Sequence, residues 1–294
     1  MRSTLATRSL GFAFPEIRWR RDKEILFGLI VIVTLVLLAL FGPLIIPADP
    51  NAQDLADAYR PPAYLAGGSG EHLLGTDSLG RDILGRVVHG ARVALFVALV
   101  ATVASAAIGT AVGLVAGYSR GWVDEVVMRL VDTWMSFPPV LLAVVLMAIW
   151  GVGVWQVILA IALVDWTRFA RVIRGEVFNI REQDYVEAAR ALGMGSLRIM
   201  REEVFPNVVP LLLVLSSIEL GLAIIIEALL SFVGLGVKAS TPSWGAMISE
   251  GLGYFRTAWW GLAFPMVFLI ITVFAFNVLG DGLRKRLDPR MPLD

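Results

Sequence analysis

The chain has 294 residues, of which 57% are hydrophobic and only 17% are charged, and its formal net charge is zero. Soluble domains carry about 25% charged residues, so this chain has too little polar surface to cover a water-soluble globule. The neutral balance gives no general attraction to nucleic acid, and the absence of cysteine excludes disulfides and thiolate metal sites. The composition therefore predicts an all-α integral membrane protein.

Six segments are apolar enough and long enough to cross a bilayer, which requires about 20 residues of helix. The first, "ILFGLIVIVTLVLLALFGPLII", is too long for the core of a signal peptide, and no small-residue cleavage site follows it. The third is expected to bend at Pro138 and Pro139, and the turn "WGVGVW" separates it from the fourth. The predicted spans are residues 25–46, 93–117, 126–149, 154–172, 208–235 and 259–280.

The distribution of basic residues predicts the orientation, because cytoplasmic loops retain arginine and lysine. These residues are concentrated before the first span, between the fourth and fifth spans, and after the sixth. The three groups are Arg2, Arg8, Arg18, Arg20, Arg21 and Lys23; Arg168, Arg171, Arg174, Arg181, Arg190, Arg198 and Arg201; and Arg284, Lys285, Arg286 and Arg290. We therefore expect an N-terminal segment (1–24), a loop (173–207) and a tail (284–294) in the cytoplasm, with the transmembrane domain at 25–283.

The second span carries a row of glycines, Gly109, Gly113 and Gly117, at i, i+4 and i+8 spacing. In lipid there is no hydrophobic force to join helices, and a row of small residues lets another backbone approach closely. The row predicts a packing face for another helix, either of this chain or of a partner.

The stretch "YVEAARALGMGSLRIMREEVFPNVVP" interrupts the apolar sequence of the second half with small and charged residues. Helical spacing places Tyr185, Ala188, Ala189 and Leu192 on one face. Gly193 is well placed to end this helix in the left-handed conformation.

A second short helix is expected after the glycine, capped by Ser196 and ended by Pro206. Leu197, Met200 and Val204 would form its apolar stripe. The result is a helix–glycine–helix elbow on the cytoplasmic face, where a patch of alanines would admit a close partner. The alternative is an interfacial helix that lies on lipid headgroups.

Glu187, Ala188 and Ala189, followed by Gly193 and Pro206 at their spacing, resemble the EAA loop of ABC importer permeases. Four more segments are similar to the second-subunit branch of the dipeptide, oligopeptide and nickel permease subfamily, so the resemblance covers most of the chain. They are "HLLGTDSLGRDILGRVVHGARVAL", "GYSRGWVDEVVMRLVDTWMSFP", "ALLSFVGLG" and "NVLGDGLRKRLDPR".

The resemblance implies the type I ABC importer permease fold and a multi-pass permease subunit of the bacterial inner membrane. The implied solutes are di- or oligopeptides, with nickel chelates, opines, glutathione or another small solute as alternatives. The implied partners are a second permease in a heterodimer, two ATP-binding subunits and an extracytoplasmic solute-binding protein. The implied coupling site for the ATPase is Glu187, Ala188, Ala189, Arg190, Gly193 and Pro206.

Three carboxylates lie within or beside apolar runs: Asp165, Glu219 and Glu227. A charge in lipid is costly and usually faces a cavity or a partner, so each is a candidate functional group. Two roles remain open. The carboxylates could line the solute path and meet the amino group of a peptide, or they could make polar contacts between helices or with the partner permease.

The sequence contains no G-x-x-x-x-G-K-[S/T] phosphate loop and no constellation of nucleophile, base or metal ligands. His72 and His89 lie far apart without ligand-spaced partners, so no metal site is expected. We therefore expect a transport subunit that is not an enzyme and binds no cofactor, with ATP and Mg²⁺ held by partner chains. The rival, a self-sufficient secondary carrier or channel, would show inverted repeats, and the two halves show no convincing self-similarity.

Overall fold

The computed structural model describes residues 23–46, 49–119 and 121–287, and the predicted all-helical fold is confirmed there. Within those ranges the only β-type pairing is an isolated bridge between Thr76 and Asp82. The predicted N-terminal segment, apart from its last two residues, and the tail beyond Leu287 lie outside the described residues.

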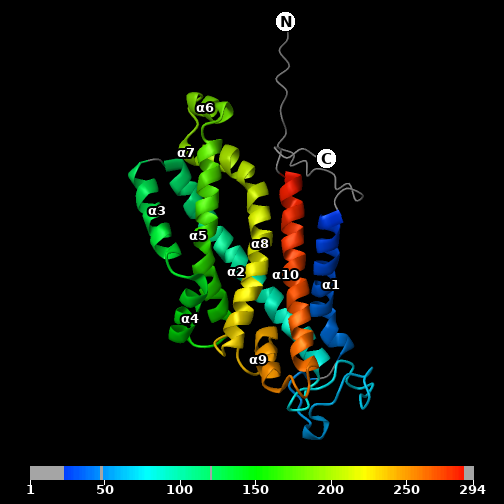
Figure 1. The fold of residues 1–294 in the computed structure, drawn as a ribbon. Helices are drawn as coiled ribbons and strands as arrows, with labels where there is room; N and C mark the ends of the chain where they lie inside the picture. The colour runs from blue at the N-terminus through cyan, green and yellow to red at the C-terminus, as the bar shows by residue number, and fades with distance from the viewer. Residues whose placement is uncertain (1–22, 47–48, 120, 288–294) are drawn as a thin grey trace.

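The long helices lie beside one another as a bundle, with α2 crossing obliquely behind the others (Figure 1). The α-helices in the described residues are α1 (Lys23–Ile45), α2 (Ile83–Ser119), α3 (Trp122–Met135), α4 (Pro139–Trp150), α5 (Val154–Ile180), α6 (Asp184–Ala191), α7 (Ser196–Ile199), α8 (Phe205–Phe232), α9 (Trp244–Tyr254) and α10 (Trp260–Leu287). A 3-10 turn, η1 (Leu55–Asp57), and a π-helical turn, η2 (Met200–Val204), complete them.

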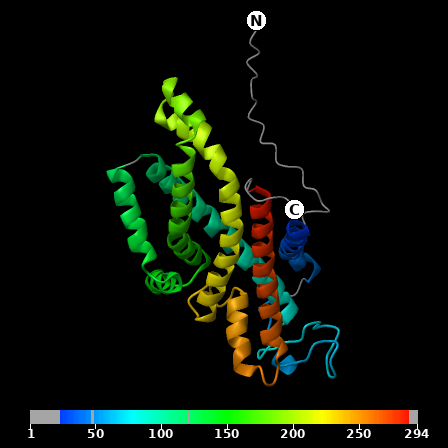
Figure 2. The ribbon, with the colours of Figure 1, turned by 45° about the horizontal axis from the view of Figure 1, so that its top comes forward.

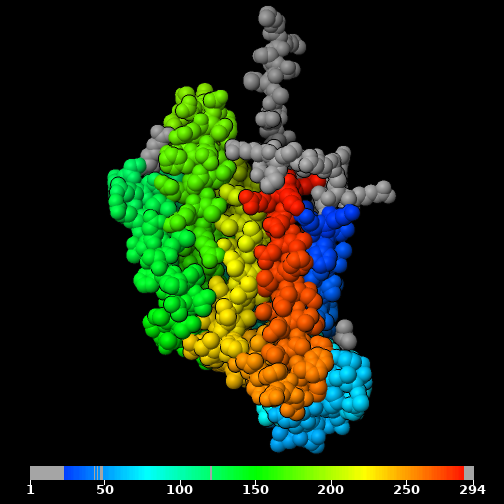
Figure 3. Space-filling view, viewed as in Figure 1, coloured from blue at the N-terminus to red at the C-terminus, as the bar shows by residue number. Residues whose placement is uncertain are grey.

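The two ends of the bundle differ in what they carry. The elbow end carries α6 and α7, together with the start of α1 and the end of α10, which are joined by a salt bridge of 2.7 Å between Lys285 Nζ and Glu24 Oε1. The loop end carries α9 and residues 49–82 (Figures 1 and 3). Both described chain ends therefore lie on the same side as the elbow.

Among the described residues, four helices are long and apolar enough to cross a membrane: α1, α2, α10, and the continuous helix formed by α7, η2 and α8. The bent pair α3 and α4 brings the number to five. α5 contains the fourth of the six predicted spans, residues 154–172. This helix lies along α2, but its second half carries Asp165, Arg168, Arg171 and Arg174, so it is less apolar than the others.

The predicted bend in the third span is a complete break. α3 and α4 are joined by three residues and lie at 83° to each other, so α4 turns across the direction of the bundle (Figure 2). The residue before a proline disfavours the helical conformation. Phe137 and Pro138 are both followed by a proline, so neither favours continuing the helix. Pro138, with ψ 125°, is consequently the N-cap, and α4 starts at Pro139.

Two buried features attach the loop end to the bundle. Residues 83–92 form the first turns of α2, whose side chains Ile83, Val87 and Val88 are buried. Trp244 of α9 is fully buried and donates its indole N–H to the carbonyl of Val87 at 2.9 Å. Amphipathic patterning alone does not distinguish burial in lipid from burial against α9.

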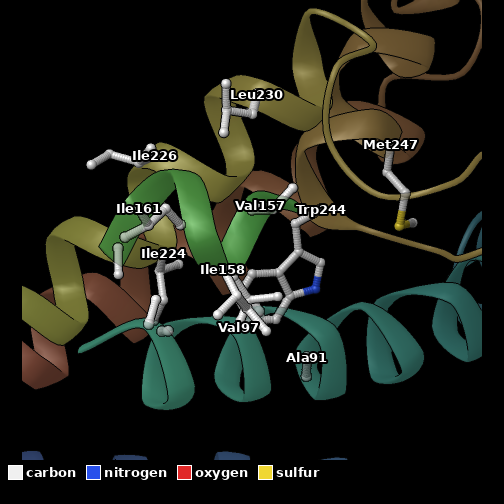
Figure 4. Packing of buried hydrophobic residues seen from close by; sticks show 14 of the residues in the cluster. Ala91, Val97, Val157, Ile158, Ile161, Ile224, Ile226, Leu230, Trp244 and Met247 are labelled. Atoms are coloured by element: carbon white, nitrogen blue, oxygen red, sulfur yellow. The ribbon is translucent and has the colours of Figure 1, made fainter. Parts of the chain in front are cut away.

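The main core lies where α2, α5 and α8 meet, with α9 packed against its loop end. Figure 4 shows Val97 of α2 and Ile158 of α5 beside the indole of Trp244, with Ile224 of α8 further along the same core. A second cluster at the elbow end joins α5 to α6, α7 and the start of α8. These two cores hold the polar residues described below in fixed positions.

Candidate coupling and transport sites

Helix α6 ends in a complete Schellman turn. The amide of Gly193 donates to the carbonyl of Arg190 at 3.0 Å, and the amide of Met194 donates to the carbonyl of Ala189 at 3.1 Å. Gly193 has φ +85°, the left-handed conformation that this motif requires at its position. The sequence-based placement of Gly193 thus corresponds to the turn that separates α6 from α7.

The two faces of α6 have different surroundings. Val186 and Ala189 are buried in the second cluster, against Ile199 of α7 and Val208 of α8. Ala188 lies on the exposed face. The prediction that Tyr185, Ala188, Ala189 and Leu192 form one shared face is therefore wrong for Ala189, because the 100° step between neighbours turns it towards its own chain.

The exposed face of the elbow is apolar at its centre. Leu192 of the α6 C-cap is 85% exposed and Leu197 of α7 is 79% exposed, with Tyr185 on the same side. Figure 3 shows this segment projecting beyond the rest of the bundle. Projecting leucines at such exposure are unusual for a surface that meets only water, and they indicate a surface that another protein or lipid covers.

The side chains of Glu187 and Arg190 lie in different surroundings. The guanidinium of Arg190 lies 6.0 Å from the ring centroid of Tyr118, at the end of α2. Glu187 is exposed, and the described residues show no ion pair between it and Arg190. Glu187 is therefore one of the exposed acidic groups of the elbow, together with Asp184 of the same helix.

The second half of the elbow differs from the prediction. Ser196 is the first residue of α7 and makes no capping hydrogen bond, and the N-cap is Gly195. Pro206 does not end this helix, since α7, η2 and α8 run on as one. The π-helical turn ahead of Pro206, in which the amide of Phe205 donates to the carbonyl of Met200, accommodates a proline that lacks an amide hydrogen. Leu197 is exposed, so the buried stripe consists of Ile199 and Val204.

Arg181, which the sequence marks only as one more positive charge, is buried at the base of the elbow. Its Nη1 donates to the carbonyl of Gly117 at 2.6 Å, and the guanidinium lies 3.6 Å from the ring centroid of Phe178. It joins the end of α5 to the end of α2. No local sequence pattern marks this role, because its partner is a backbone carbonyl 64 residues away.

The glycine row faces α5 of the same chain. A Cβ on Gly109 would stand 2.3 Å from the carbonyl oxygen of Trp166, and one on Gly113 would stand 2.7 Å from that of Ala170. A Cβ on Gly117 would stand 2.8 Å from Cβ of Val177. Glycine at all three positions lets the two helices pack backbone to backbone.

The three predicted carboxylates are all buried, on two helices. Glu219 of α8 lies 3.5 Å from Arg168 of α5 through both of its oxygens. Glu227 accepts a hydrogen bond of 2.8 Å from Ser231 one turn along α8. Asp165 lies one turn from Arg168, close enough to interact with its charge and with that of Glu219, and its Oδ1 has no hydrogen-bond partner among the described residues. None of the three presents its carboxylate to a surface.

Arg168, counted at first as a loop charge, faces a pocket at the break between α3 and α4. Trp134 closes one side, and its indole N–H donates to the carbonyl of Leu163 at 2.6 Å. The lining residues are Trp134, Met135, Phe137, Pro139, Leu142, Val164, Thr167 and Arg168.

The loop end holds a network of buried ionic contacts. Arg86 of α2 contacts both Asp77 and Glu250 of α9, and Arg81 bonds the same two carboxylates, each at 2.7 Å. Burial and the neighbouring charge of Asp77 raise the pKa of the Tyr254 hydroxyl. The network ties the loop of residues 49–82 to α9.

His72 lies between two carboxylates of the same loop, with Nδ1 3.1 Å from Asp82 and Nε2 3.4 Å from Asp57. In the part of the chain that the structure describes, no group of three or more histidine and acidic residues has the geometry to hold a metal ion.

A bundle of long apolar helices with one broken span is the architecture of an integral membrane protein. The chain belongs to the binding-protein-dependent transport system inner membrane component family, which matches residues 109–292. The N-terminal transmembrane domain of oligopeptide transport permease C matches residues 17–62. The chain is thus an integral membrane permease of the ABC importer type.

Relatives of the chain match over nearly its whole length. The di/tripeptide transport system permease protein DppC of Pseudomonas aeruginosa is 40% identical over 92% of this chain and 89% of its own length. The oligopeptide transport system permease protein OppC of Bacillus subtilis is 38% identical over 94% and 88%. A solved structure, the methionine ABC transporter MetNI in inward-facing conformations, shares the fold with a TM-score of 0.58 at 21% identity, covering 69% of this chain and 96% of that chain.

Proposed function

We propose that this chain is one of two permease subunits of an importer that carries di- or oligopeptides across the membrane, driven by separate ATPase subunits. The relatives named above are permeases for dipeptides, tripeptides and oligopeptides. At 40% identity over almost the full length, a shared class of solute is the simplest interpretation. A binding protein on the loop-end side would deliver the peptide.

The observation that carries the proposal is the geometry of the elbow. Its inner face is anchored to its own chain through Val186 and Ala189, and its outer face presents Leu192 and Leu197, which are exposed beyond the bundle. A helix that is rigidly attached on one side and apolar on the other is suited to transmit a push or pull from a partner. The sequence has no phosphate loop, so that force must come from another chain.

In this mechanism, closure of the ATPase pair moves α6 as a rigid lever. Two connections would transmit this movement to the membrane helices. Arg181 connects the base of the elbow to α2 and α5, and the unbroken helix through η2 connects the elbow to α8. Tilting these helices together would open the solute path alternately to the two sides. The coupling site is Glu187, Ala188, Arg190, Gly193 and Leu192 at the surface, with Ala189 and Pro206 supporting it from inside.

The proposal is tested with the assembled complex. This chain is co-expressed with a second permease, the ATPase subunits and the binding protein from its own organism, purified through a tag on this chain, and placed in liposomes. We expect ATP-driven uptake of labelled dipeptides, and loss of both ATPase co-purification and uptake in Leu192→Asp. A complex that hydrolyses ATP in response to its binding protein but moves no peptide would show that the solute assignment is wrong.

A further inference from the structure

Arg168 lies inside the predicted span of residues 154–172. It is about 21 Å along α5 from Val154, and Glu219 is about 20 Å along α8 from Phe232, and both distances are shorter than the roughly 30 Å of a hydrocarbon core. An ionisable residue at that depth is costly and needs a partner or a polar cavity. Arg168 has both, which distinguishes it from the arginines near the elbow.

The side chain of Arg168 is accessible, whereas its acidic neighbours are not. It is 34% exposed and lines the pocket at the α3–α4 break, while the Glu219 side chain is 4% exposed and Asp165 is buried. A solute in this pocket would therefore meet the guanidinium rather than a carboxylate. Of the two roles left open for Glu219 and Glu227, polar contact between helices is therefore favoured over contact with the amino group of a peptide.

The contact with Glu219 leaves most of the guanidinium unused. Only Nη1 reaches the two carboxylate oxygens, and both distances are 3.5 Å, at the long limit for a hydrogen bond. The described residues provide no hydrogen bond to Nε or Nη2. Arginine has five donors in a planar fork that can bind a second carboxylate with two parallel bonds. Glu219 holds the fork in place, and the free edge remains for a ligand.

The rest of the pocket suits the same kind of ligand. Pro139 and Leu142, from the first turn of α4, also line the pocket, so the positive end of a helix of 12 residues lies beside it. Apart from Thr167 and Arg168, the lining residues are apolar or aromatic, including Trp134 and Phe137. An anionic group attached to an apolar body fits such a lining.

We propose that Arg168 contacts the transported solute and receives the C-terminal carboxylate of a peptide in the pocket at the α3–α4 break, with Glu219 as its positioning residue. This inference rests on the proposed function and specifies which end of the solute the permease recognises. It assigns the buried carboxylates to support of the arginine rather than to the solute.

The test uses the natural absence of cysteine in this chain. Phe137→Cys places a thiol in the pocket lining, and Leu159→Cys places one on α5 away from the pocket at nearly the same exposure, 54% against 53%. The assembled permease–ATPase complex, without binding protein, is treated with a small thiol reagent, and the labelling rate of this chain is measured by mass spectrometry. The additives are a dipeptide that the system transports, its C-terminal carboxamide and its N-acetyl form.

We expect the dipeptide and its N-acetyl form to slow the labelling of Phe137→Cys, and the carboxamide to be at least about tenfold less potent, because it lacks the charged acceptor. Adding Arg168→Gln to Phe137→Cys should abolish this difference, and Leu159→Cys should show no protection. The inference is overturned if the carboxamide protects equally, if the difference between dipeptide and carboxamide survives Arg168→Gln, or if Phe137→Cys does not react because another subunit covers the pocket.

Failure of this inference and failure of the proposed function give different results. Peptide uptake by the unmodified complex without Arg168-dependent protection would remove only the assignment of the pocket. Absence of peptide uptake by the unmodified complex would remove the solute class as well, whatever the labelling shows.

Discussion

The turn between α6 and α7 depends on a single backbone conformation at Gly193. The φ of +85° costs a residue with a side chain about 1–2 kcal/mol, although nothing lies within 4 Å of the position a Cβ would take. We therefore expect Gly193→Ala to loosen the turn and to lower ATP-driven uptake several-fold while the chain still inserts. Gly195→Ala is the matched control, because that residue is equally open but has φ −68°. Equal uptake by the two variants would show that the turn does not transmit force.

Adjacent alanines in α6 are expected to respond differently to the same change. Ala188→Asp adds a charge to the exposed face, so it should prevent ATPase co-purification while hydrogen exchange of the α6 amides stays unchanged. Ala189→Asp buries an unpaired carboxylate among Val186 and Ile199, which should speed α6 exchange even without the ATPase. If Ala188→Asp also speeds α6 exchange, the two-faced description of the helix is wrong.

The sequence predicted which residues form the elbow better than it predicted which way their side chains face. The small residues and Gly193 could be recognised from their order along the chain. Which alanine faces the protein could not, because the choice depends on where α5 and α8 stand relative to α6. Arg181 and Arg168 were missed for a similar reason: their partners, Gly117 and Glu219, are distant in sequence.

Among the elements, the close packing of α2 on α5 depends on the glycine row. Gly109→Ala places a methyl group 2.3 Å from the carbonyl oxygen of Trp166, and backbone cannot move aside as a flexible side chain would. We expect a loss of about 1–3 kcal/mol, seen as a lower midpoint of thermal unfolding in detergent. Gly175→Ala, at an exposed position of α5 with nothing within 4 Å, should be neutral or gain about 0.5–1 kcal/mol.

A Gly109→Ala variant as stable as Gly175→Ala would mean that α2 and α5 separate more easily than their packing indicates. Because α5 carries Arg168 and the base of the elbow, such freedom would also disconnect the pocket from the lever.

At the level of elements, hydropathy identified the four helices that are long and apolar enough to cross a membrane, and proline chemistry indicated the break between α3 and α4. Hydropathy could not predict where α2 starts, because its first turns pack against α9 and the loop of residues 49–82 rather than against lipid. The continuity of α7, η2 and α8 through Pro206 could not be predicted from local rules either, since the π-helical turn lies where Val204 is buried in the second cluster.

In the whole molecule, the two ends can be assigned to the two sides of the membrane. Arginines are frequent around the elbow, and the end of α10 adds Arg284, Lys285 and Arg286 beside it, so this end should face the cytoplasm. Leu192→Cys at the elbow and Leu252→Cys on α9 are exposed reporters in a chain that has no other thiol. An impermeant maleimide should label only Leu252→Cys in intact spheroplasts and should reach Leu192→Cys only in inside-out vesicles. Bound ATPase subunits should then slow the labelling of Leu192→Cys, whereas labelling of this residue from outside would place the elbow where no ATP-driven partner could reach it.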